Sequence, residues 1–404
     1  MKTGLTFLIA ARECEIGELE QLALTSALVG AIGRLVHALQ RERGMSNVFL
    51  ASGGTRFAEQ RTAQIGTCDA IAREVRGQFD ALDTQAGQVR NGARLFNRIA
   101  VVLHGLDALP DLRARIAAQA LGQDESTAAF VRLLAGLLAV VFEAADSATD
   151  PDISRALVAM FNFMQGKEFS GQERAFGGGC FASGHADGAH QQQWLHLIES
   201  QERCFQVAMN FSDASVREAW QAAEKASPLA DLERLRRIGC APRADGHLDP
   251  DLSQGWYDAC TLRIDLMREV EELLATRLRT LCETRIASAR AELRDQQAIL
   301  ATLSHEAQAG ASERTAGYGP QLDRSILTMV QEQSQRLQEM NDELETVRAS
   351  LNERKLIERA KGLLMAARKV DEAEAHKMLR QTAMNQNRRL LDVAQSVLAM
   401  SDYL

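Results

Sequence analysis

The chain has 404 residues, of which 46 % are hydrophobic and 25 % charged, with a formal net charge of −8. That length is enough for two or more domains, and six prolines, few aromatic residues and long Ala/Leu/Gln/Glu/Arg-rich stretches predict an all-α protein without a β-rich part. The seven cysteines include no CxxC pair and form no dense framework, so we interpret them as reduced core residues.

The N-terminal run "LTFLIAA" is short and leads into "RECEIGELE" rather than a cleavage site. No segment shows the uninterrupted apolar length of a membrane helix, so we expect no membrane contact and a cytoplasmic protein. Segments rich in Gly, Pro and Asp punctuate the chain as turns. Between them the sequence predicts helices at about 18–51, 57–82, 87–107, 127–147, 151–176, 189–225 and 255–306. The run Gly177–Gly179 is interpreted as letting a helix end close to its neighbour.

An internal repeat lies within this helical region. The segment "ERGMSNVFLASG" at 42–53 aligns without gaps on "ERAFGGGCFASG" at 173–184, with identical Glu, Arg, Ala, Ser and Gly positions. We expect each copy to end a helix, after a Gln-containing turn and before a glycine stop. Such a duplication predicts two pseudo-symmetric helical bundles whose equivalent residues converge at their interface.

The repeat contains a pair of equivalent arginines, Arg43 and Arg174. Arg43 continues an apolar stripe of its helix, where a charge is costly unless it is paired. One interpretation is an intrachain ion pair with Glu42 or Glu173, or a side chain that reaches water. The other is an anion site, because the flat guanidinium fork matches a trigonal oxyanion in a bidentate way.

The run "LVHALQRERGMSNVFLASGG", with the later "FSGQERAFGGGC", resembles the NIT family of nitrate- and nitrite-sensing domains. The resemblance covers roughly residues 30–300. It implies that nitrate or nitrite binds between two helical bundles, held here by Arg43 and Arg174. The ligand is then an effector, and no cofactor is expected.

Other candidate chemistry is weaker. Cys180 and His185 could be drawn as a nucleophile and its base, but no orienting third group is apparent, and we predict no enzyme. His185, His190 and His196 have irregular spacing around a Gly-rich turn, so we predict no metal site.

A Gly-rich segment at 309–320 is interpreted as a linker that ends a sensor domain at 1–308. Residues 321–351 follow as a predicted coiled coil. Apolar residues recur there in steps of three and four, at Leu337, Met340, Leu344, Val347 and Leu351. This stripe is expected to meet its twin in a second subunit, which predicts a homodimer.

Residues 352–404 are predicted to form three short helices. From residue 351 onward, ten basic residues face seven acidic ones, whereas the remainder of the chain is acidic. This asymmetry is typical of a nucleic-acid-binding end, although solvated helical faces give similar patterns.

The motifs "IERAKGLLM" and "LRQTAMNQN" resemble the ANTAR family, three-helix modules that bind RNA hairpins and control transcription termination. Lys361 and Arg380 occupy positions of the family motif and are predicted RNA contacts. Arg354, Arg388 and Arg389 are predicted outer phosphate contacts. The order NIT, coiled coil and ANTAR is that of nitrate-responsive antiterminators.

The sequence therefore predicts a regulator in which nitrate or nitrite releases the C-terminal module to bind a leader-RNA hairpin. The alternative is a helical signalling adaptor whose C-terminal helices bind a protein partner.

Overall fold

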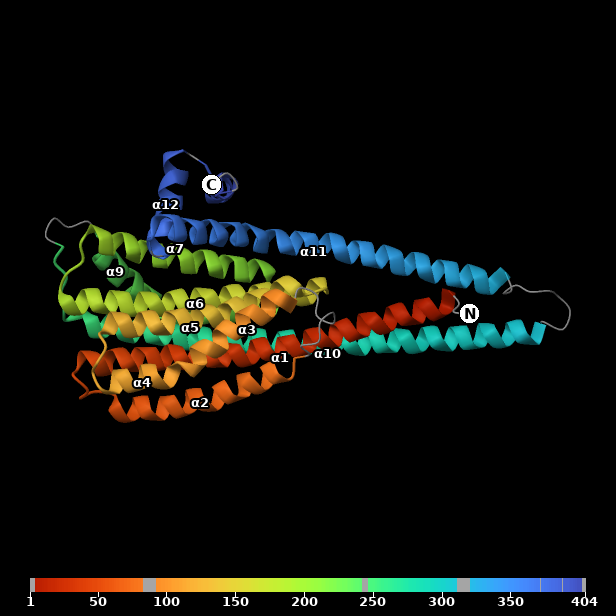
Figure 1. Cartoon of the computed structure of the whole chain (residues 1–404), viewed down its shortest axis with the longest axis horizontal. Coiled ribbons are helices and arrows are strands. Elements are labelled where there is room, and N and C mark those ends of the chain that lie inside the picture. Colours follow the sequence, from red (N-terminus) through yellow and green to blue (C-terminus); the bar gives the residue numbers. More distant parts are fainter. Residues whose placement is uncertain are drawn as a thin grey trace. The chain divides into compact units, whose positions relative to one another are not determined.

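The structure is a computed structural model that describes residues 4–82, 92–241, 246–310, 320–370, 372–386 and 388–401. The chain forms two compact units, Met1–Gln331 and Glu332–Leu404. Every regular element in the described ranges is an α-helix, as predicted, and Figure 1 shows those of the first unit running lengthwise beside one another. They are α1 (Gly4–Ala51), α2 (Ala58–Asp80), α3 (Gly92–Asp107), α4 (Leu109–Ala117), α5 (Gln123–Ser147), α6 (Pro151–Ser183), α7 (Gly188–Phe211), α8 (Ala214–Ala226), α9 (Leu229–Cys240) and α10 (Leu252–Gly310).

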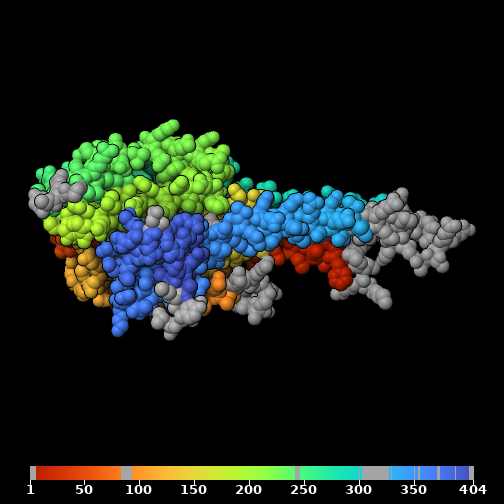
Figure 2. Space-filling view, turned by 90° about the horizontal axis from the view of Figure 1, so that it is seen from above, coloured from red at the N-terminus to blue at the C-terminus, as the bar shows by residue number. Residues whose placement is uncertain are grey.

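The first unit contains two groups of helices. α1 packs on α2 and α5, with α3 and α4 completing the first group, whereas α6 packs on α7 and α9. The long helix α10 contacts both α1 and α6 and so joins the groups. Figure 2 shows the α7 to α9 segment, in green, along one side of the first unit. Two copies of the repeated motif end α1 and α6, the central helix of each group.

The glutamates of the repeat make equivalent ion pairs. Arg113 of α4 binds Glu42 of α1 through Nε and Nη2, at 2.8 Å to each carboxylate oxygen. Arg236 of α9 binds Glu173 of α6 through the same two nitrogens, at 2.8 and 2.6 Å. We call these two bidentate ion pairs the clamps. Because each clamp lies within its own group of helices, the duplication seen in the sequence extends to the side-chain geometry.

Helix α6 shows how local chemistry sets the helix limits. Asp150 accepts a hydrogen bond from the Ile153 backbone N–H at 2.9 Å, and Pro151 occupies the first turn, where its missing N–H costs nothing. Gly184 ends the helix at φ 68°, a conformation that favours glycine. In the other copy Gly53 has φ 61°. The predicted Gln-containing turns are wrong, because Gln40 and Gln172 lie inside α1 and α6.

Several predicted boundaries are also wrong. The first helix begins at Gly4 rather than 18, and the predicted helix 189–225 is two helices, because Asp213 accepts from the Val216 N–H and caps α8. The segment "LPD" opens α4, since proline fits the first turn of a helix. α9 was not predicted at all. Both omitted helices are short and amphipathic, and they supply the arginines of the two clamps.

The glycine run does not end α6, which continues to Ser183. A Cβ at Gly177 would lie 2.5 Å from Trp194 and 2.6 Å from Trp256. The two indole rings, whose centroids are 5.0 Å apart, are buried against this glycine. Close packing against a neighbour was therefore the correct part of the interpretation.

Two helices have the length and composition that membrane helices show. α1 and α5 contain 18-residue stretches with mean hydropathy 1.6 and 2.0. More than half of each stretch, 61 % and 56 %, is buried inside the protein. Central helices of a globular core have this composition because they pack against other helices on several sides.

The C-terminal helices are α11 (Pro320–Arg368), α12 (Glu372–Asn385) and α13 (Leu390–Ser401). The predicted linker falls mostly on 311–319, outside the described residues, and the predicted coiled coil lies within α11. A small core joins the end of α11 to α12 and α13. It is formed by Ala360, Leu379, Ala383, Val393 and Ala394. This is the predicted three-helix module.

Candidate functional site

Arg43 lies in α1 facing α6, with 2 % of its surface exposed. Its guanidinium binds the carboxylate of Glu168 in a bidentate pair, with Nη1–Oε1 at 2.5 Å and Nη2–Oε2 at 3.3 Å. Gln40 and Gln172 donate to the same carboxylate at 2.7 and 2.9 Å. A Cβ at Gly171 of α6 would lie 2.9 Å from Arg43 Nη2, so the arginine reaches the α6 backbone.

Neither glutamate predicted as a partner of Arg43 is bound to it. Glu42 and Glu173 are held by Arg113 and Arg236 in the two clamps. Adjacent helical residues point about 100° apart, so Glu42 faces away from Arg43 into its own group of helices. An intrachain ion pair exists, as one interpretation held, but its partner is Glu168.

Arg174 lies in α6 and is also buried, with 8 % of its surface exposed. Nη1 donates to Thr261 Oγ1 of α10 at 3.1 Å, and the guanidinium carbon lies 5.1 Å from the centroid of the Tyr257 ring. Nη2 lies 3.2 Å from the position of a Cβ at Gly44, next to Arg43 in α1. In the described part of the chain no carboxylate forms an ion pair with Arg174. Burial, and then the nearby Arg43 charge, lower the pKa of Arg174.

Further charged residues lie near Arg43 and Arg174, where α1, α6 and α10 pack against one another. We call this region the α1–α6–α10 layer. Lys167 is fully buried and pairs with Glu271 of α10, while burial lowers its pKa and Glu271 opposes that effect. His37 of α1 has its pKa lowered to about 2 by burial and then by surrounding cations, Lys167 first among them. The cations that contribute to this shift after burial are Lys167, Arg268, Arg41 and Arg174.

The structure thus brings both predicted arginines between α1 and α6. It also shows five neighbours that the sequence interpretation missed: Glu168, Gln40, Gln172, Tyr257 and Thr261. A signal for Glu168 was available, because it is an acidic residue on the apolar side of α6 six positions before Arg174. The α10 residues gave no local signal, since only packing brings that helix to the site.

The predicted RNA contacts lie on α11, on α12 and just before α13. Lys361 of α11 is 7 % exposed and pairs with Glu358 at 2.7 Å, and Arg380 of α12 is half-buried. Arg388, before α13, is exposed and donates to Asp392 O and Ser396 Oγ at 2.9 Å each. Arg389 pairs with Asp392 at 3.1 Å, which lowers the pKa of that carboxyl. The side chain of Arg354 lies outside the described part.

The residues considered for catalysis and metal binding lie at the end of α6, in α7 and between these two helices. Burial raises the pKa of the Cys180 thiol to about 11, which keeps it protonated and weakly nucleophilic at neutral pH. His190 Nδ1 lies 2.7 Å from Asp187, which caps α7. Within the ranges described, no group of three His, Cys, Asp or Glu residues is placed to hold a metal ion.

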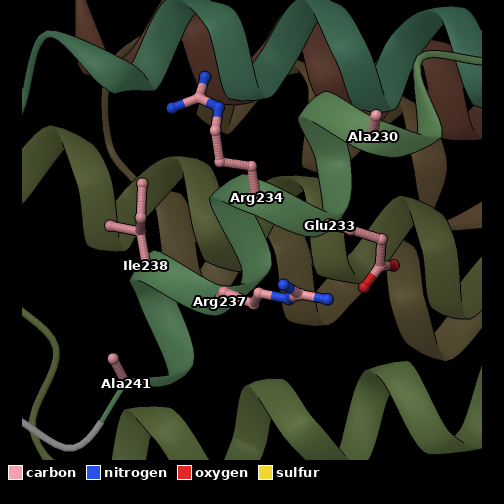
Figure 3. Close-up of a pocket in the computed structure, with 6 residues that line it drawn as sticks. All are labelled: Ala230, Glu233, Arg234, Arg237, Ile238 and Ala241. Atoms are coloured by element: carbon pink, nitrogen blue, oxygen red, sulfur yellow. The ribbon is translucent and has the colours of Figure 1, made fainter.

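A shallow hollow of about 520 Å³ lies along α9, away from the arginines. Figure 3 shows its lining, all from this helix and the residue that follows it. The side chains are those of Ala230, Glu233, Arg234, Arg237, Ile238 and Ala241. Arg234 and Arg237 extend outward there, whereas Arg236 between them turns inward to Glu173. The hollow and the site at Arg43 share no residue.

Fold and site define a class of protein: an all-helical sensor unit with buried arginines, joined through a long helix to a three-helix output module. Residues 34–279 match the family model described as nitrate and nitrite sensing, and residues 345–398 match the ANTAR domain. The chain belongs to the nitrate- and nitrite-sensing family, with a C-terminal ANTAR domain.

Relatives share both parts. The chain is 33 % identical over 393 residues to the nitrate regulatory protein of Klebsiella oxytoca, covering 96 % of this chain and 93 % of that protein. It is also similar to the solved structure of the NasR transcription antiterminator, with a TM-score of 0.60, 32 % identity and 98 % of each chain covered.

Proposed function

We propose that this chain is a nitrate- or nitrite-responsive transcription antiterminator whose effector binds between Arg43 and Arg174. The observation that carries the proposal is the buried Arg174 guanidinium, which has no carboxylate partner among the described residues and lies beside Arg43. A buried charge without a counter-charge is costly, so a protein that retains one gains stability from binding an anion there. The family match supports nitrate and nitrite as that anion.

The chemistry of the site favours a small planar oxyanion. Two guanidinium groups present forked N–H donors that match oxygen pairs on a trigonal anion. Thr261 Oγ1 and the Tyr257 ring limit the space beside Arg174. Chloride offers no oxygen pair, and sulfate is tetrahedral and doubly charged, so neither fits as well.

The output is RNA binding by the ANTAR module. We propose that effector binding releases this module to bind a leader-RNA hairpin and prevent a terminator from forming, in the cytoplasm and as a homodimer. A coupling of roughly 1–3 kcal/mol changes RNA affinity by about five- to hundredfold. The chain acts as a regulator and requires no cofactor besides its effector.

Calorimetric titration of the purified protein with nitrate, nitrite, chloride and sulfate tests the sensor. Nitrate or nitrite should bind, and chloride and sulfate should not. Arg43→Lys and Arg174→Lys should each weaken binding by about tenfold or more, because the charge remains while the bidentate fork is lost. Unchanged affinity in both variants would place the effector elsewhere.

Filter binding with leader RNA tests the output. Lys361→Ala and Arg380→Ala should reduce RNA binding without changing nitrate affinity, and each lost phosphate contact should lower the log-log salt slope by roughly 0.7 on single-stranded RNA. Lys377→Ala, an exposed residue of the same helix as Arg380, is the matched control. Wild-type affinity and salt slope in both test variants would show that other residues bind the RNA.

The alternative, an adaptor whose C-terminal helices bind a protein, is not favoured by the ANTAR match or by the similarity to an antiterminator. An absence of leader-RNA binding at any nitrate concentration would restore it.

A further inference from the structure

Glu168 presents a planar oxyanion to Arg43 in the centre of the sensor unit. Glu168 is 2 % exposed. Its carboxylate accepts hydrogen bonds from four donor atoms: two on Arg43, one on Gln40 and one on Gln172. Both oxygens are therefore fully engaged. A carboxylate group has the trigonal shape and the single charge of nitrate and nitrite, and it meets the guanidinium through the same pair of N–H groups.

We propose that Glu168 is a tethered competitor, whose carboxylate occupies on Arg43 the place that the effector takes and is displaced when the effector binds. This proposal rests on the proposed function, because it assumes that Arg43 contributes to the nitrate or nitrite site. It adds a residue that sets the affinity of that site and a contact that opens on binding.

Displacement follows from the use of the donors. The Nη1 and Nη2 atoms of Arg43 already bind Glu168, so a free anion cannot form a bidentate pair on that side while the carboxylate stays. Arg174, beside Arg43 and without a carboxylate partner in the described residues, supplies a second fork that attracts a free anion. Lys167, the neighbour of Glu168 in α6, interacts electrostatically with its carboxylate.

The exchange changes how two helices are joined. Glu168 belongs to α6 and Arg43 to α1, so their ion pair is a cross-link between the two groups of the sensor unit. An untethered anion on Arg43 removes this cross-link. Lys167 of the same turn is paired with Glu271 of α10, the helix that leads along the chain to the C-terminal module. Effector binding thereby acts on the α1–α6–α10 layer.

The direct test is Glu168→Gln, which keeps the size and hydrogen-bonding groups of the side chain and removes its charge. If the carboxylate occupies Arg43 nearly all of the time, the apparent affinity of wild type is reduced by the fraction of free sites. Glu168→Gln should therefore bind nitrate at least about tenfold more tightly in calorimetry. Unchanged or weaker binding by a variant that retains wild-type helicity would overturn the proposal.

Two further variants separate competition from a general effect of charge. Gln172→Leu removes one donor that holds the carboxylate, at a half-buried position, and should tighten nitrate binding by a smaller factor without a change of charge. Glu143→Gln removes a buried carboxylate of α5 that pairs with Arg98 at 3.6 Å. It should leave nitrate affinity unchanged. Equal tightening in Glu143→Gln and Glu168→Gln would count against a specific competitor.

A thermal measurement tests the oxyanion-binding position on Arg43 independently of nitrate sensing. Glu168→Ala leaves Arg43 without its carboxylate, so formate should refill the position and raise the melting temperature of this variant in a concentration-dependent way, but not that of wild type. If wild type binds neither nitrate nor nitrite while formate stabilises Glu168→Ala, the proposed sensor function is wrong and the oxyanion-binding position on Arg43 is supported. If formate, nitrate and nitrite all leave the melting temperature of Glu168→Ala unchanged, Arg43 does not form an oxyanion-binding position.

Discussion

The buried basic side chains of Arg43, Lys167 and Arg174 differ in their interaction partners. Arg43 and Lys167 each have a carboxylate partner, and Arg174 has a hydroxyl and an aromatic ring instead. An ion pair offsets much of the desolvation of both charges, whereas a hydroxyl offsets little. Arg174, which has no carboxylate partner among the described residues, is thus a local cost to the fold, which is a frequent property of binding sites.

Removal of these two arginine charges should have opposite effects on stability. Arg174→Met removes an unpaired buried charge and should leave the melting temperature of the nitrate-free protein unchanged or raise it, while abolishing stabilisation by nitrate. Arg43→Met leaves Glu168 buried without its partner and should destabilise the fold by about 3–5 kcal/mol. Thermal melts with and without nitrate measure both effects. Comparable destabilisation by the two variants would contradict this account of Arg174.

The neutral His37 makes stability depend on pH. Its pKa is about 2 in the folded protein and ordinarily 6.5, so between these values the unfolded chain binds more protons. Stability contributed by neutral His37 is therefore present above pH 6.5 and lost as pH falls. The loss from pH 7 to 5 is at most about 2 kcal/mol.

Denaturant unfolding at a series of pH values checks the contribution of His37. His37→Gln should flatten the dependence between pH 7 and 5, and His104→Gln, at an exposed position, is the control. An identical pH slope in wild type and His37→Gln would show that another group causes the loss.

At the scale of elements, α6 carries most of the features that the site needs. It holds Glu168 and Arg174, and its glycines allow close contact with other elements. Gly171 admits the Arg43 guanidinium, and Gly177 admits two indole rings. Glycine destabilises a helix interior by about 0.5–1 kcal/mol relative to alanine. At both positions this loss of helix stability accompanies a close contact that a larger side chain would prevent.

Two glycines of the same run should respond oppositely to alanine. At Gly177 a Cβ would lie 2.5 Å from Trp194, so Gly177→Ala should destabilise the protein by about 1–3 kcal/mol through overpacking. At Gly179 nothing lies within 4 Å, and Gly179→Ala should stabilise by about 0.5–1 kcal/mol. Denaturant titration followed by tryptophan fluorescence compares them. A stabilising Gly177→Ala would refute the tight tryptophan contact.

At the scale of the whole molecule, α11 connects sensing to output and is the predicted dimer element. Within the predicted heptad stripe, Leu337 is 54 % exposed, whereas Leu344, Val347 and Leu351 are buried. The prediction of a partner helix therefore applies to the exposed part of the stripe at Leu337. Leu337→Glu should weaken dimerisation by placing a charge in the stripe, and light scattering over a range of concentrations measures this. Gln338→Glu adds the same charge beside the stripe and should leave the dimer intact. Equal dimerisation of both variants would place the subunit interface elsewhere.

The sequence also set limits on what could be predicted. Long helices, the glycine stops of the repeat and the three-helix module follow from periodicity and turn chemistry, although the start of the first helix and the break between α7 and α8 did not. The short helices α4 and α9 were missed, because amphipathic helices of 9 and 12 residues give a weak periodic signal. Their arginines, Arg113 and Arg236, form ion pairs with Glu42 and Glu173 of the repeat. These two glutamates are therefore not partners of Arg43.

The sequence by itself determined the all-helical class, the family resemblance and the equivalence of Arg43 and Arg174, because each of these is written in local patterns. Tertiary structure alone decided the partners of the two arginines. Glu168 lies 125 positions from Arg43 and Thr261 lies 87 positions from Arg174. Which side chain meets a buried charge depends on how the helices are rotated and packed against one another, and that packing is fixed by the summed burial of apolar surface along whole helices rather than by any local motif.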